Sequence, residues 1–225
     1  MPKVISSTQT IIAEGDSLLV KSHANNAAIY PNSGSDTNSL IPAEGRGFTW
    51  SWWQRQNTED GAGSEINYLT VRPNGGGTPV MKFVKVGNTN NGEIRATFIG
   101  TSGQYQVHWN GFGLTYLING VGNWYNFVIS WSGETDTLEE NLFLYVNGSK
   151  LSHSGIHDGL ATNLASTTNG ELIFFGPTRT SSNTSADLND ANITHMSWWN
   201  QQLTDSQITE LYNGGRAFDV STRHS

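Results

Sequence analysis

The chain has 225 residues, a length that suits one large β domain better than two. Its formal net charge is -7 and it has no run of Lys and Arg, which excludes nucleic acid as a partner. It has no cysteine, which excludes a disulfide framework and a thiolate metal site. No stretch approaches the roughly 18 apolar residues needed for membrane insertion as a spanning helix.

The amino-terminal segment is polar, with Val4, Ile5, Ile11 and Ile12 set among polar neighbours. It lacks the apolar core and the small-residue cleavage site of a signal peptide. We expect residues 1–14 to form an N-terminal extension or an added edge strand. Residues 15–225 contain no composition break or linker, which predicts a single domain.

Alternation of apolar and polar residues predicts strands along most of the chain. In residues 47–56, Phe48, Trp50 and Trp52 fall on one face of a strand with a period of two. The Gly- and Asn-rich turns separate further predicted strands at 65–72, 79–86, 93–99, 104–109, 123–131, 141–150, 171–176 and 193–199. The pair Asn147-Gly148 is typical of a type I′ hairpin turn.

A short helix is predicted after the last strand. Thr204 supplies an N-cap oxygen, and Gln207, three residues on, completes a capping box. Ile208, Leu211 and Tyr212 form one apolar stripe about two turns long. So short a helix needs a sheet beneath it.

This closing strand and helix resemble the closing motif of laminin-G-like domains in the concanavalin A-like superfamily of lectins and glucanases. The matching residues are Ile193, Met196, Trp198, Trp199, Asn200, Leu203, Thr204, Ile208, Leu211, Tyr212, Asn213 and Gly214. Residues 47–56, 123–131 and 141–150 resemble earlier strands of the family. The resemblance implies an all-β fold: a concanavalin A-like jelly-roll sandwich of two antiparallel sheets with one short C-terminal helix. Ala191 and Thr194 stand where the family commonly has Gly and an acid.

Carbohydrate binding requires aromatic faces that stack on sugar rings, with amide and carboxylate groups beside them. Matches to apolar family positions place four tryptophans in the core: Trp50, Trp52, Trp124 and Trp198. The remaining aromatic and polar residues give these candidate carbohydrate-binding residues: Trp109, Asn110, Tyr105, His108 and Trp53. A strand tryptophan buried in the core is the alternative interpretation for Trp109.

The resemblance also suggests calcium as a cofactor, because relatives often hold this ion with loop oxygens. The densest such cluster is Asp187, Asn189 and Asp190. Asp and Asn also dominate ordinary turns, which is the alternative.

A catalytic alternative rests on Glu134 and Glu139, which have the spacing of retaining glucanases of the superfamily. Such enzymes need two carboxyls about 5 Å apart on one strand. Here the motif falls where the laminin-G-like pattern has an exposed loop, so we expect no catalytic residues.

Three functions suit this fold, and the lack of a signal peptide and of cysteine, with the Ser-, Thr-, Asn- and Gly-rich composition, favours the first. The first is a non-catalytic structural subunit on a virion or phage particle surface, with other subunits of a surface assembly and cell-surface glycans as partners. The second is a free or secreted lectin-like module, and the third is a retaining glucanase. Fold alone does not decide between them. The expected location is a virion surface or the extracellular space.

Overall fold

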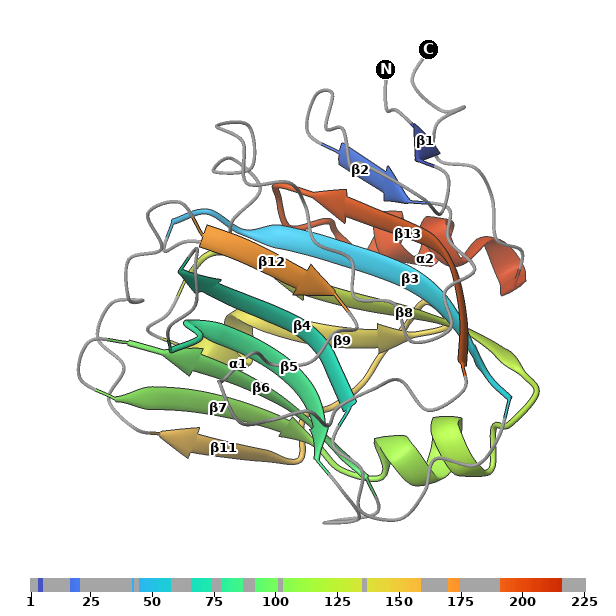
Figure 1. Ribbon diagram of the computed structural model, residues 1–225, viewed down its shortest axis with the longest axis horizontal. Helices are drawn as coiled ribbons and strands as arrows, with labels where there is room; N and C mark the ends of the chain where they lie inside the picture. The colour runs from blue at the N-terminus through green and yellow to red at the C-terminus, as the bar shows by residue number, and fades with distance from the viewer. Residues whose placement is uncertain are drawn as a thin grey trace.

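A computed structural model describes residues 4–5, 17–20, 42, 45–57, 66–73, 78–86, 92–100, 103–134, 137–158, 170–174 and 191–215. Two β-sheets pack face to face, and the N- and C-terminal strands lie in the same sheet (Figure 1). Every neighbouring pair of described strands is antiparallel except β1 and β2. The predicted all-β sandwich of two antiparallel sheets with a short C-terminal helix is confirmed.

The seven-stranded sheet has the order β1-β2-β13-β3-β8-β9-β10. Its strands are β1 (Val4–Ile5), β2 (Ser17–Val20), β13 (Ala191–Trp199), β3 (Phe48–Gln56), β8 (Trp124–Trp131), β9 (Leu142–Val146) and β10 (Ser149–Lys150). The six-stranded sheet has the order β11-β7-β6-β5-β4-β12. Its strands are β11 (Gly155–Asp158), β7 (Gln104–Trp109), β6 (Glu93–Ile99), β5 (Met81–Val86), β4 (Ile66–Pro73) and β12 (Gly170–Phe174).

Among the described residues, four short helical segments connect or follow the strands: η3 (Gly113–Ile118), α1 (Leu138–Asn141), α2 (Asp205–Tyr212) and η4 (Asn213–Gly215). The predicted capping box is present at α2, where Thr204 and Gln207 bond each other's backbone N–H groups. The predicted hairpin turn is also present, since Asn147 and Gly148 both have positive φ, 52° and 73°. The chemistry of caps and turns is local, which explains why the sequence predicted both.

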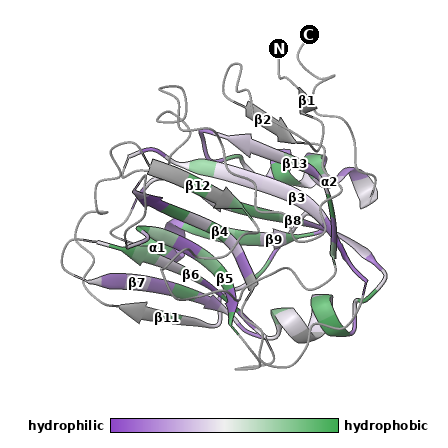
Figure 2. Cartoon of the chain, viewed as in Figure 1, coloured by the Kyte–Doolittle hydropathy of each residue, from purple (hydrophilic) through white to green (hydrophobic). Residues whose placement is uncertain are grey.

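The core lies between the sheets and is built from aromatic residues that recur with a period of two. Trp50 and Trp52 stack with ring centroids 4.1 Å apart, and Phe48 stacks on Trp198 at 4.7 Å. Figure 2 shows hydrophobic and hydrophilic segments within β4, β5 and β6. Such ring pairs contribute about 0.5–1.5 kcal/mol each beyond the area that they bury.

One charged residue shares this inner face. Lys85 follows Met81 and Phe83 at intervals of two along β5, and only 1% of its surface is exposed. Burial disfavours the ammonium form and lowers the pKa of Lys85 from 10.5 to about 8. The folded protein therefore releases this proton at a lower pH than the unfolded chain does.

We expect the free energy of unfolding to rise with pH from about 8 to 10, because only the unfolded state then keeps the Lys85 proton. The rise is on the order of 2 kcal/mol and should vanish in Lys85→Met, whereas Lys82→Met, which changes a part-exposed lysine of the same strand, should retain it. Urea unfolding at several pH values measures it. An unchanged pH slope in Lys85→Met would contradict this assignment.

Candidate functional site

Strand β7 divides the predicted sugar-binding residues between its two faces. Tyr105 and Trp109 point between the sheets, and Trp109 is only 2% exposed within the aromatic core. His108 faces the other side of the strand by its period of two. A ring in the position of Trp109 has no face left for a sugar, so the structure contradicts the prediction that Trp109 stacks on a pyranose.

The other two predicted residues of this segment, Tyr105 and Asn110, form hydrogen bonds within the protein. The Tyr105 hydroxyl donates a hydrogen bond to the Glu139 carboxylate. The backbone N–H of Asn110, an exposed residue in the turn after β7, donates to Ser154 Oγ at 2.8 Å. The structure thus does not bring Tyr105, His108, Trp109 and Asn110 together into one binding surface.

The outer face of the six-stranded sheet carries a closed polar network. Glu93 Oε1 lies 2.8 Å from Arg95 Nη2 and 3.3 Å from His108 Nδ1. His108 Nε2 lies 3.3 Å from Gln106 Oε1. Because Glu93 is 1% exposed and its carboxylate already has two basic neighbours, this network satisfies a buried charge rather than offering it to a ligand.

The glutamates of the catalytic alternative lie on different elements. Glu134 sits in the loop after β8, where its carbonyl accepts a hydrogen bond from Trp131 Nε1 at 2.8 Å. Glu139 lies in α1. The single strand on which a retaining pair alternates is therefore missing at this motif.

The calcium candidates Asp187, Asn189 and Asp190 lie outside the described residues. Within the described part of the chain, no group of three or more His, Asp or Glu side chains is arranged to hold a metal ion. Calcium therefore stays a prediction.

Helix α2 covers part of the outer face of the seven-stranded sheet (Figure 1). Ile208 packs with Val128 and Tyr145, and the Tyr145 hydroxyl donates to Asp205 Oδ1 at 2.6 Å. Burial, together with this bond, raises the pKa of Tyr145. Trp53, the fifth predicted sugar-binding residue, is 5% exposed and stacks on Tyr212 at 6.0 Å, so it anchors the end of α2.

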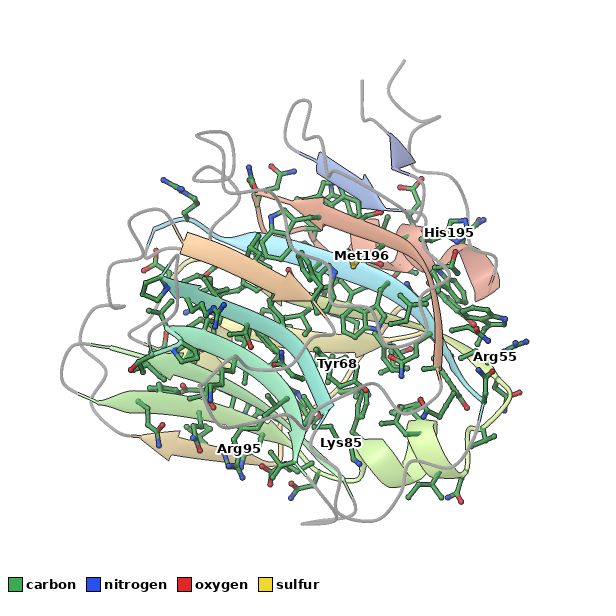
Figure 3. The ribbon with its side chains drawn as sticks, viewed as in Figure 1. Arg55, Tyr68, Lys85, Arg95, His195 and Met196 are labelled. Carbon is green, nitrogen blue, oxygen red and sulfur yellow. The ribbon has the colours of Figure 1, made fainter. Side chains whose placement is uncertain are left out.

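Beyond Trp53 the same face of the sheet opens to solvent. Arg55 follows two residues later on β3, and its partners across the sheet are Trp124 of β8 and Asn192 of β13. Figure 3 shows Arg55 at the periphery of the molecule. These three side chains form a row across three strands, which we call the Trp124 patch.

Trp124 is 37% exposed, which corrects the prediction that it belongs to the core. Among the described residues, the exposed large apolar side chains are those of Trp124 and Ile156. The reason is the period of two: Trp131 is a core residue of the same strand, and seven positions separate it from Trp124. An odd spacing on one strand places two residues on opposite faces.

The groups beside Trp124 retain hydrogen-bonding capacity. The Arg55 guanidinium carbon lies 5.4 Å from the centroid of the Trp124 ring, and Arg55 Nε is buried with no hydrogen-bond partner among the described residues. Asn126 Oδ1 is also buried and lacks a partner there, although Asn126 Nδ2 donates to Ser51 Oγ at 3.1 Å. Buried polar atoms without partners cost free energy, so such groups point to a missing partner.

No protein-family model matches the chain, and no curated protein matches it. Among solved structures, the chain is similar to the binding domain of botulinum neurotoxin serotype G, at 14% identity and a TM-score of 0.52, covering 87% of this chain and 42% of that one. It is likewise similar to the binding domain of botulinum neurotoxin DC in complex with rat synaptotagmin II, at 13% identity and a TM-score of 0.52, covering 89% and 43%. A third match, the same DC domain in complex with SialylT, has 12% identity, a TM-score of 0.52 and the same coverage.

At these identities the likeness shows the fold alone, a β-rich sandwich. The chain spans less than half the length of each of these neighbours. No described helix is long and apolar enough to cross a membrane.

Proposed function

We propose that the protein is a non-catalytic, carbohydrate-binding module and that its sugar lies on the Trp124 patch. The observation that carries this proposal is the exposed Trp124 indole beside the Arg55 guanidinium, whose Nε lacks a hydrogen-bond partner among the described residues. An indole stacks on the apolar face of a pyranose, and adjacent polar groups fix its hydroxyls.

The lectin-like sandwich supports this proposal at the level of the fold. Among the neighbours, the botulinum neurotoxin DC binding domain was solved once with rat synaptotagmin II and once with SialylT, which makes protein and glycan partners the two natural classes to test. Those partners belong to proteins more than twice as long as the matched part. The Trp124 patch, rather than those complexes, is therefore the basis of the site.

The proposed context is the surface of a virion or phage particle, with a concanavalin A-like jelly roll of laminin-G-like type as the scaffold. A free or secreted lectin is the alternative. The Gly-, Asn-, Ser- and Thr-rich composition supports an exposed setting in both cases. Size-exclusion chromatography with light scattering separates them: defined trimers or larger assemblies support the particle subunit, and a monomer that binds glycan supports the free lectin.

Replacing Trp124 by alanine should weaken glycan binding at least about tenfold, because the stacking surface is lost. A glycan array followed by titration calorimetry measures the loss. The matched control is Ile156→Ala, which removes a side chain that is 40% exposed on β11 of the other sheet and should leave binding unchanged. Equal affinity of wild-type protein and Trp124→Ala would contradict the site, and no glycan binding by wild-type protein would contradict the function.

A further inference from the structure

We infer that the sugar bound at the Trp124 patch carries a carboxylate group, which Arg55 recognises. This inference rests on the proposed function and narrows its ligand class. It comes from the electrostatics of Arg55, whose charge no acidic residue in the described ranges offsets.

Arg55 is a cation that the described protein does not neutralise. Its recorded interaction is with the Trp124 ring, and no carboxylate within the described residues forms an ion pair with it. By contrast, Arg95 of the six-stranded sheet forms an ion pair with Glu93, with 2.8 Å between Arg95 Nη2 and Glu93 Oε1. Neighbours of Arg55 across the sheet are the neutral residues Trp124 and Asn192.

The surroundings of Arg55 favour binding of a planar anion such as a carboxylate. A guanidinium presents its N–H donors as a rigid fork that matches a carboxylate through two parallel hydrogen bonds. Arg55 Nε is buried, and a charge-assisted bond is stronger where water is excluded. Contact with the indole holds the guanidinium in place, so less side-chain entropy is lost when an anion binds.

The distance between Arg55 and Trp124 selects among anionic sugars. The guanidinium carbon lies 5.4 Å from the ring centroid, so an anion on Arg55 has to lie close to a pyranose stacked on the indole. A carboxylate bonded directly to a ring carbon, as in uronic and sialic acids, meets this requirement. A sulfate ester sets its charge one linking oxygen farther from the ring, which fits the patch less well.

The chain as a whole repels anions, because its formal net charge is -7. A preference for acidic sugars therefore has to come from a local contact. We therefore expect specificity to arise from one residue rather than from a basic surface. That expectation makes a single substitution decisive.

The test uses an array that carries uronic acid and sialic acid glycans beside their methyl esters and beside sulfated glycans. The best acid and its ester are then titrated into wild-type protein, Arg55→Gln, Arg55→Lys and Lys82→Gln. Methyl esterification removes the charge and keeps the ring. Lys82→Gln removes the same charge from the other sheet and serves as the matched control.

Wild-type protein should bind the acid about 10- to 100-fold more tightly than the ester. Arg55→Gln should bind the acid and the ester with equal affinity, Arg55→Lys should keep part of the preference for the acid, and Lys82→Gln should keep all of it. A structural effect of Arg55 on Trp124 would weaken binding of acid and ester by the same factor, whereas loss of anion recognition changes the ratio of the two affinities.

Equal binding of acid and ester by wild-type protein, a preference that survives in Arg55→Gln, or stronger binding of sulfated glycans would each overturn the inference and leave the proposed function standing. Absence of binding to every glycan on the array would overturn both.

Discussion

Replacing Trp109 by alanine should lower the free energy of unfolding by about 3–5 kcal/mol. The indole is 2% exposed and belongs to the aromatic core between the sheets, where β6 sets Ile94 opposite it. Alanine would leave a cavity that the rigid strands cannot close, so the lost transfer free energy and the lost packing add. Urea unfolding followed by circular dichroism measures the change.

The matched control for Trp109→Ala is Trp124→Ala, which removes the same side chain from a partly exposed position. We expect the two substitutions to separate stability from binding. Trp109→Ala lowers stability, with binding retained by the molecules that stay folded, and Trp124→Ala weakens binding with a much smaller loss of stability. If Trp109→Ala abolished glycan binding without moving the unfolding midpoint, Trp109 would be a ligand-binding residue after all.

The strands of the sandwich were largely predictable because their signals are local. The period of two identified β3 from Phe48, Trp50 and Trp52, and turn and cap chemistry identified the hairpin at Asn147-Gly148. Strand β11 was missed, since Gly155 opens a short edge strand that has little alternation and resembled a Gly-rich loop. Helix α1 was missed for a related reason, because four residues are too few to show a helical period.

The binding surface was less predictable, because it depends on the register between strands distant in sequence. Alternation shows which residues of a strand share a face, but in β3 both faces are buried, so Trp50 and Trp53 could not be told apart by composition. The row of Asn192, Arg55 and Trp124 exists only through the pairing of β13, β3 and β8. One signal was present in the sequence: the odd spacing of Trp124 from Trp131.

Replacing Gly92 by alanine should lower the free energy of unfolding by about 3 kcal/mol, whereas Gly111→Ala should cost only about 1 kcal/mol. Both glycines have left-handed φ angles, +78° and +75°, so both substitutions carry the same backbone cost. The two positions differ in the room that they leave for a side chain. A Cβ on Gly92 would lie 2.5 Å from Gly113 Cα, whereas a Cβ on Gly111 would meet nothing within 4 Å. Urea unfolding of the two variants measures the difference, and equal losses would show that the close approach to Gly113 is easily relieved.

The contact between Gly92 and Gly113 also links the start of β6 to the segment that leads to Trp124. The N–H of Gly113 donates to the Gly92 carbonyl at 2.7 Å, and the chain then continues through η3 to Gly122, whose N–H donates to the Gln56 carbonyl at 2.8 Å. Trp124 follows two residues later, opposite Arg55. Displacing Gly113 should therefore shift the segment that positions Trp124, and Gly92→Ala should weaken glycan binding although Gly92 lies beside the other sheet. Gly111→Ala is the control, and undiminished binding by folded Gly92→Ala would mean that β8 positions Trp124 without help from η3.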